Sequence, residues 1–201
     1  IFNLREQQVM LQAKHFRQVI RDFSPTIGDE IEHIGEGASI DPLFIYALNA
    51  RSEILNNSVL GPSISECTAI FCQRSGLLMQ NWDWSEALEA LVVLMRVTLT
   101  NGLRICQLTE PGIVGKIGMN SAGIGVCLNI LKVARVLKGV PVHVLLRHAL
   151  ESQDFVTARQ GLQRNSEGKA SHVLLGERGG ACHSVEFCGA RAYELAPHDD
   201  L

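Results

Sequence analysis

The sequence predicts an α+β fold, in which helices and strands form separate layers. Apolar residues follow helical spacing up to about residue 55, whereas short apolar runs typical of strands follow Cys67. Helical spacing then returns, and a last group of strand-like runs ends the sequence. A doubly wound sheet would need helices and strands that alternate along the chain, so this order favours the α+β class.

The expected helices are supported by residue spacing and by start signals. Val9 and Phe16 belong to an apolar stripe at helical intervals, with charged residues between its members. Asp41-Pro42 is a strong start signal, because Asp caps a first turn and Pro is tolerated in it. Residues 56–66 are rich in Asn, Ser, Gly and Pro, which predicts an exposed linker. The expected helices cover residues 1–22, 25–37, 43–55, 140–154 and 155–164.

The expected strands are short apolar runs separated by turn signals. Asn101-Gly102 is a strong hairpin signal, and Arg74-Ser75 separates two runs with hairpin spacing but weaker turn chemistry. The expected strands cover residues 67–73, 76–83, 90–100, 103–108, 122–130, 170–175, 183–187 and 191–195.

The composition is that of a soluble globular protein. Apolar residues make up 46% of the 201 residues and charged residues 19%, with a net charge of −3. The basic residues are scattered and only 5% of residues are aromatic, which argues against nucleic-acid binding. The longest apolar run, Ala90–Met95, is far too short to cross a membrane. We therefore expect neither a nucleic-acid partner nor a membrane partner.

Cofactor, metal and disulfide signals are weak. The six cysteines include no Cys-x-x-Cys pair, which favours buried thiols in a reducing, cytoplasmic compartment. His143 and His148 are five positions apart and would point in different directions on one helix. Gly115-Lys116 lacks the Ser or Thr that follows in a phosphate-binding loop. We expect no metal and no cofactor.

The segment that starts just before Cys67 carries the functional signal. Its two blocks are Glu66-Cys67-Thr68-Ala69-Ile70-Phe71-Cys72-Gln73 and Gln80-Asn81-Trp82-Asp83. Further blocks lie at residues 35–38, 48–53, 109–123, 129, 139–141, 147 and 149–152. In this order they resemble the acyl-coenzyme A:6-aminopenicillanic acid acyltransferase (isopenicillin N acyltransferase) family of cysteine N-terminal-nucleophile hydrolases. The resemblance extends from about residue 31 to residue 187.

The resemblance implies a four-layer αββα sandwich, incomplete in this chain because family members continue well beyond Leu201. It also implies an inactive precursor that breaks its own Glu66–Cys67 bond. Residues 1–66 would then be a helical pro-segment ending in a linker, and 67–201 the nucleophile-bearing part of the αββα domain. The two products would form a heterodimer, and a homo-oligomer is left open. Relatives usually carry a small residue where this sequence has Glu66.

The expected chemistry starts at Cys67. A cysteine thiol with a pKa of about 8.5 needs a base, and a freed α-amino group with a pKa of about 7.7–8.0 can take its proton. By resemblance, Asp83 would hold that amino group and Asn129 would donate to the oxyanion. Gln80 would have a polar positioning role. Outside this context Cys67 could be a small buried hydrophobe, Asp83 a strand-end cap and Asn129 a turn former.

The substrate class implied is a small-molecule amide, N-acyl or peptide-like, or an acyl-coenzyme A. Trp82 and Asn81 are candidates for substrate contact, with Trp82 or Trp84 lining the pocket. The sequence leaves hydrolysis and acyl transfer open. A non-catalytic relative that keeps the fold without maturing is the alternative from another functional class. Among other residues, we expect an ion pair between Arg51 and Glu53 and a turn-forming role for Asn120.

Overall fold

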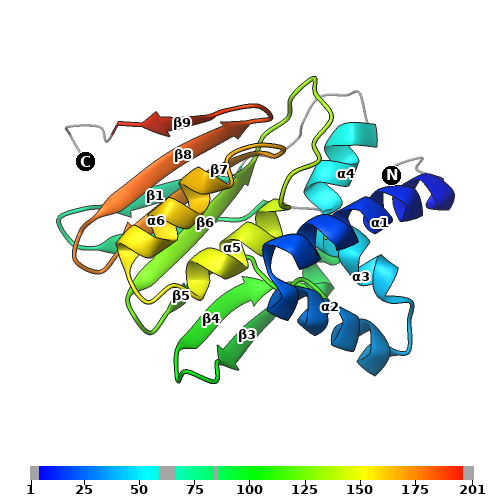
Figure 1. Cartoon of the computed structure of the whole chain (residues 1–201). Coiled ribbons are helices and arrows are strands. Elements are labelled where there is room, and N and C mark those ends of the chain that lie inside the picture. The colour runs from blue at the N-terminus through cyan, green and yellow to red at the C-terminus, as the bar shows by residue number, and fades with distance from the viewer. Residues whose placement is uncertain (1–4, 59–66, 84–85, 197–201) are drawn as a thin grey trace.

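The computed structural model describes residues 5–58, 67–83 and 86–196, and it confirms the expected α+β class (Figure 1). The helices are α1 Glu6–Phe23, α2 Pro25–Ala38, α3 Pro42–Asn49, α4 Arg51–Ser58, α5 Val142–Leu150 and α6 Phe155–Arg164, with a 3-10 helix at Glu86–Leu91. The strands are β1 Thr68–Cys72, β2 Leu77–Asn81, β3 Val93–Thr98, β4 Arg104–Thr109, β5 Ile117–Asn120, β6 Ile124–Ile130, β7 Ala170–Glu177, β8 Cys182–Cys188 and β9 Ala192–Leu195.

The N-terminal helices begin at the predicted signals. The Asp41 carboxylate accepts a hydrogen bond from the Leu43 backbone N–H at 2.9 Å, and Pro42 occupies the first turn of α3. The single helix expected over residues 43–55 is wrong, because the chain leaves helical geometry at Ala50 and forms α3 and α4. Contacts on both sides of Ala50 account for the break. Asn49 bonds to the 112–114 segment, and Arg51 bonds to Glu110.

The central element is a seven-stranded antiparallel sheet in the order β3-β4-β5-β6-β7-β8-β9. Helices α5 and α6 connect β6 to β7 and cover one face of this sheet (Figure 1). Alternate residues of β6 and β7, including Val126, Leu128 and Val173, are buried against Leu145 and Leu146 of α5. This apolar layer is the main core, and it fixes which residues of each strand face the opposite side.

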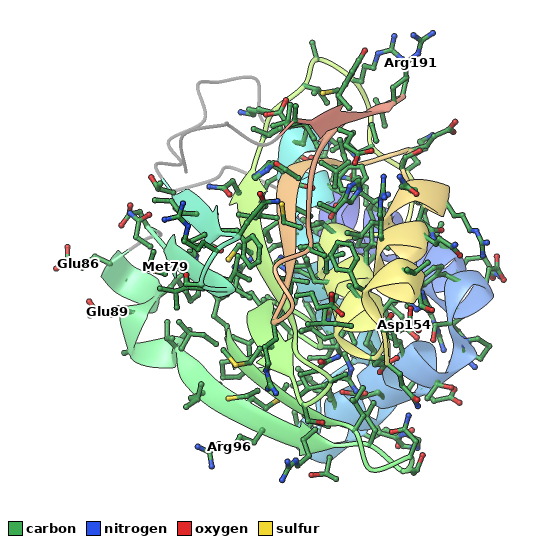
Figure 2. All side chains as sticks on the ribbon, turned by 90° about the vertical axis from the view of Figure 1, so that its left-hand side faces the viewer. Met79, Glu86, Glu89, Arg96, Asp154 and Arg191 are labelled. Atoms are coloured by element: carbon green, nitrogen blue, oxygen red, sulfur yellow. The ribbon has the colours of Figure 1, made fainter. Side chains whose placement is uncertain are left out.

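Strands β1 and β2 form a separate hairpin on the other face of the sheet. Its register runs from Thr68 opposite Asn81 to Cys72 opposite Leu77. The side view in Figure 2 shows the hairpin, marked by Met79, and α6, near Asp154, on opposite sides of the sheet. The described residues therefore form a layer of helices, a large sheet and a hairpin, with α1–α4 packed beside them.

Two glycines allow the hairpin to approach the sheet. A Cβ atom at Gly125 would lie 2.8 Å from Cδ2 of Leu78, and one at Gly176 would lie 2.7 Å from the Phe71 ring. Both distances are shorter than van der Waals contact, so a side chain at either position would push the hairpin away.

Strand β5 was not expected from the sequence. It lies in the glycine-rich segment 112–125, where the apolar alternation typical of a strand is missing. A Cβ atom at Gly118 would lie 2.4 Å from the Cys106 carbonyl oxygen, so β5 needs glycine there to pair with β4. Asn120 has the expected turn-forming role, because its side-chain oxygen accepts hydrogen bonds from the Ala122 and Ile124 backbones.

Candidate active site

Cys67 lies directly before β1, beside the residues that follow β2. Its thiol donates a hydrogen bond to the Asp83 carbonyl oxygen, with a sulfur–oxygen distance of 3.6 Å. Asn81 links the two strand ends, because its Oδ1 accepts from the Thr68 N–H at 2.6 Å and its Nδ2 donates to Asp83 Oδ2 at 2.7 Å. The hairpin register thus brings the predicted nucleophile and the predicted acidic partner together.

Asn129 reaches the same place from β6. Its Nδ2 donates a hydrogen bond to the carbonyl oxygen of Cys67 itself, and its Oδ1 lies 3.2 Å from Nδ1 of His172. The Asn129 side chain points toward the hairpin, because alternate residues of β6 face the helices. The structure therefore brings Asn129 to the Cys67 backbone.

Gln80 connects the hairpin to the large sheet. Its Nε2 donates to the Leu128 carbonyl oxygen at 2.6 Å, and its Oε1 accepts from the Leu128 N–H at 2.9 Å. These two bonds fix the Gln80 amide to the β6 backbone at the residue before Asn129. This arrangement fits a positioning role better than direct contact with a reacting group.

A charged cluster that the sequence analysis missed lies beside Cys67. Arg51 donates two hydrogen bonds to the Glu110 carboxylate, at 2.8 and 2.7 Å, and Lys116 donates to the same carboxylate. The Lys116 Nζ also lies 3.8 Å from the centroid of the Trp82 ring. Burial lowers the pKa of Lys116 to about 8, with a further contribution from the Arg51 charge. The cluster carries one more positive than negative charge.

The expected ion pair between Arg51 and Glu53 is wrong. Arg51 binds Glu110 instead, whereas Glu53 Oε1 accepts from the Val142 backbone N–H at 2.9 Å, in the first turn of α5. Burial raises the pKa of Glu53 to about 7. The two side chains therefore join the N-terminal helices to two different parts of the sheet domain. The sequence signal for Lys116 is its place in the block at residues 109–123 that resembles the family.

A small cavity of about 20 Å³ opens beside Cys67. Trp82 lines it, whereas Asn81 does not, because its amide is engaged with Thr68 and Asp83. The other lining residues are Arg51, Ser52, Lys116, Ile117, Leu128, Ile130 and His143. The cavity is therefore bordered by the N-terminal helices, the hairpin and the large sheet together.

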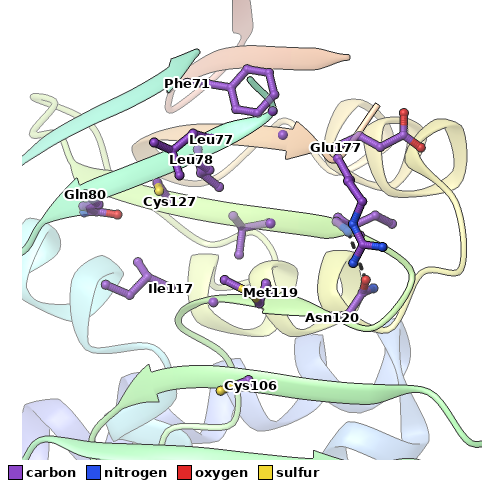
Figure 3. A pocket seen from close by; sticks show the side chains of 18 of the residues that line it. Phe71, Leu77, Leu78, Gln80, Cys106, Ile117, Met119, Asn120, Cys127 and Glu177 are labelled. Carbon is purple, nitrogen blue, oxygen red and sulfur yellow. Dashed lines mark hydrogen bonds between the residues drawn. The ribbon is translucent and has the colours of Figure 1, made fainter. Parts of the chain in front are cut away.

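A larger apolar cavity of about 410 Å³ lies between the hairpin and strands β3 to β6 (Figure 3). Gln80 and Ile117 border one end of it, and Asn120 and Glu177 border the other. Ile117 lines both cavities, so the apolar space begins next to the Cys67 site.

Within residues 5–58, 67–83 and 86–196, no cluster of His, Cys, Asp and Glu side chains is arranged to hold a metal ion. No helix in these ranges is both long and apolar enough to span a bilayer. Glu66 and Trp84, two residues of the sequence-based predictions, lie outside them.

Comparison with known proteins agrees with the resemblance found in the sequence. The family described as "Acyl-coenzyme A:6-aminopenicillanic acid acyl-transferase" matches residues 72–194. The chain belongs to this family. The matched region includes Gln80, Asp83 and Asn129, and it begins after Cys67.

A curated relative from Emericella nidulans (strain FGSC A4) supports the family membership. It is named "Acyl-coenzyme A:6-aminopenicillanic-acid-acyltransferase 40 kDa form" and is 29% identical over 177 residues. The alignment covers 87% of this chain and 49% of the relative. The chain thus spans about half the length of the curated relative that it matches.

Proposed function

We propose that the chain is the nucleophile-bearing part of a self-processing cysteine amidohydrolase or acyltransferase, with Cys67 as its nucleophile. The observation that carries the proposal is the convergence on Cys67 of side chains or backbone from three separate segments. Its thiol lies against Asp83, its carbonyl oxygen accepts from Asn129, and Lys116 lines the same small cavity. The substrate class is a linear amide, N-acyl or peptide-like, or an acyl-coenzyme A.

Maturation would be the first reaction of Cys67. Its sulfur adds to the carbonyl carbon of Glu66, and the peptide C–N bond breaks, which leaves a thioester and a free α-amino group. Water then cleaves the thioester into a Glu66 carboxylate and the Cys67 thiol. The two fragments would stay together, since Asn56, Asn57, Asn49, Arg51 and Glu53 all bond to residues after position 67.

The mature site would use one residue as both nucleophile and base. The α-amino group takes the thiol proton, the thiolate attacks the substrate carbonyl carbon, and the proton passes to the departing amine. Water or an acceptor amine then releases the acyl group from Cys67. The Asp83 carboxylate would hold the α-ammonium group, and Lys116, which lines the same small cavity as Cys67, would supply a positive charge beside the reacting sulfur.

Asn129 and Gln80 would support this reaction from β6. An asparagine amide has two N–H groups, so Asn129 can hold the Cys67 carbonyl oxygen and donate to an oxyanion beside it. Gln80 would keep the hairpin in place through its two bonds to Leu128. The layers of helices, sheet and hairpin agree with the first three layers of an αββα sandwich, which we propose as the fold of the complete protein.

The apolar cavity beside Gln80 and Ile117 suits the acyl side of such a substrate. Its lining is formed mainly by aliphatic side chains and glycines, together with Phe71, and it has room for a small acyl group. Asp83 and Glu110 would remain on the Cys67 side, where the amide bond of the substrate would lie.

The test is intact mass and N-terminal sequencing of the full-length protein, followed by assays with N-acyl-para-nitroanilides of increasing acyl length. We expect a fragment that begins at Cys67. We also expect that the para-nitroanilides are hydrolysed only by protein that contains this fragment. Cys67→Ala should leave one intact chain without activity, whereas the control Cys72→Ala should behave as wild type. A single uncut and inactive wild-type chain would instead mean either that Glu66 blocks maturation or that the chain is a non-catalytic relative.

A further inference from the structure

A line of side chains extends from Ser184 to Cys67 across three neighbouring strands. The Ser184 Oγ lies 2.8 Å from His172 Nε2, and His172 Nδ1 lies 3.2 Å from Asn129 Oδ1. Asn129 Nδ2 in turn donates to the Cys67 carbonyl oxygen. His172 is directly opposite Asn129 in the β6–β7 register, so both side chains stand on the hairpin side of the sheet.

The direction of each hydrogen bond follows from its end at Cys67. A carbonyl oxygen can only accept, so the amide nitrogen of Asn129 must face Cys67 and its oxygen must face His172. The Nδ1 of His172 then carries the proton, and the Nε2 of a neutral ring accepts from the Ser184 hydroxyl. Burial lowers the pKa of His172, although the Glu186 charge opposes this effect, which agrees with a neutral ring.

We propose that His172 is a positioning residue for the reaction of Cys67, because its Nδ1–H fixes the Asn129 amide with the nitrogen toward Cys67. Without this bond the amide could rotate and place its oxygen against the Cys67 carbonyl oxygen, which would repel it. The proposal rests on the proposed function of Cys67, and it adds His172 of β7 to the residues that support the reaction. Ser184 has a supporting role, since its hydroxyl selects the tautomer of His172.

Two substitutions at position 172 separate positioning from packing. Asparagine places its amide nitrogen near the former Nδ1 and keeps a donor for Asn129, whereas glutamine reaches the former Nε2 position and does not. We expect His172→Gln to lower kcat for para-nitroanilide hydrolysis about tenfold with little change in KM, which corresponds to one lost hydrogen bond. His172→Asn should stay within about threefold of wild type, and the exposed control His33→Gln should be unaffected.

A double-mutant cycle tests whether the effect acts through Asn129. In an Asn129→Ala background, His172→Gln should cause no further fall in kcat, because the amide that it orients is gone. Equal effects in both backgrounds, or a kcat of His172→Gln equal to that of wild type, would overturn the inference and leave Cys67 as the nucleophile.

A measurement without turnover keeps the two proposals separate. Long-range proton–nitrogen NMR of the full-length protein should show His172 as the neutral Nδ1–H tautomer, with the signal assigned by its loss in His172→Asn. The Nε2–H tautomer would refute the positioning role even in an inactive protein. Absence of processing and hydrolysis in wild type, with the Nδ1–H tautomer present, would instead count against the proposed function alone.

Discussion

Lys116 is a charged residue of the small cavity beside Cys67. Its ammonium lines the Cys67 cavity, lies over the Trp82 ring and shares the Glu110 carboxylate with Arg51. A nearby cation lowers the free energy of a thiolate relative to the thiol. We expect Lys116→Met to slow alkylation of Cys67 by iodoacetamide at pH 7 about three- to tenfold. Peptide-resolved mass spectrometry measures this rate, and the exposed Lys14→Met is the matched control. An unchanged rate would show that Lys116 has no electrostatic effect on the sulfur.

Glu53 gives a pH-dependent prediction of stability. Burial raises its pKa from 4.5 to about 7, so the folded protein binds more protons than the unfolded chain between these values. Its contribution to stability is therefore most favourable below pH 4.5 and becomes less favourable as the pH rises through 7. Glu53→Gln keeps an acceptor for the Val142 N–H without the charge. We expect urea unfolding to show that this variant gains stability relative to wild type between pH 5 and pH 8, on the order of 3 kcal/mol at most. The exposed control Glu36→Gln should show no such change, and a constant difference would contradict the prediction.

At the level of the elements, the hairpin depends on glycines in the sheet beneath it. A Cβ atom at Gly176 would meet the Phe71 ring at 2.7 Å, so Gly176→Ala should displace β1. We expect a loss of about 1–3 kcal/mol in unfolding free energy, as is typical of overpacked sites, together with slower self-processing. Phe71→Leu should restore part of the loss by making room. Gly37→Ala is the control, because a Cβ atom at Gly37 would have no neighbouring heavy atom within 4 Å. Equal stability of Gly176→Ala and wild type would argue against the tight contact.

The elements also show what could be predicted from the sequence. Both hairpins and the helix start at Asp41 depend on local signals, and these were predicted correctly. Strand β5 and the break at Ala50 were not, because each depends on contacts with distant segments. At the candidate site, the blocks that resemble the family predict Cys67, Asp83 and Asn129 as site residues. His172 was missed for the same reason as β5, since only the pairing of β6 with β7 brings it to Asn129.

At the level of the whole molecule, the N-terminal helices and the sheet domain are joined by a buried ion pair. Arg51 and Glu110 bond through both carboxylate oxygens, and little of either side chain is exposed. Removal of one partner from such a pair typically costs about 3–5 kcal/mol, because the other charge stays buried. Lys116 still neutralises Glu110, so we expect Arg51→Met to cost less, about 2 kcal/mol. Urea unfolding measures this loss, and substitution of the exposed Arg5 by Met is the control.

Under the proposed self-processing, the same contacts predict how the two fragments behave. We expect the fragment that ends at residue 66 to co-elute with the fragment that begins at Cys67 in gel filtration, and to separate from it only in denaturant. Arg51→Met should allow partial separation at lower denaturant concentrations than wild type needs. Spontaneous separation of the wild-type fragments in buffer would contradict a stable heterodimer.

The alternation of side chains along β6 limits how this protein can change. Successive residues of the strand serve two different purposes, since Val126 and Leu128 complete the core and Cys127 and Asn129 face the hairpin. Insertion or deletion of one residue between Ile124 and Asn129 would exchange the two sets, placing an amide among aliphatic side chains and an aliphatic group at Cys67. Length variation among homologues should therefore be confined to the turns, such as that at Asn101-Gly102, while β6 and β7 keep a constant number of residues.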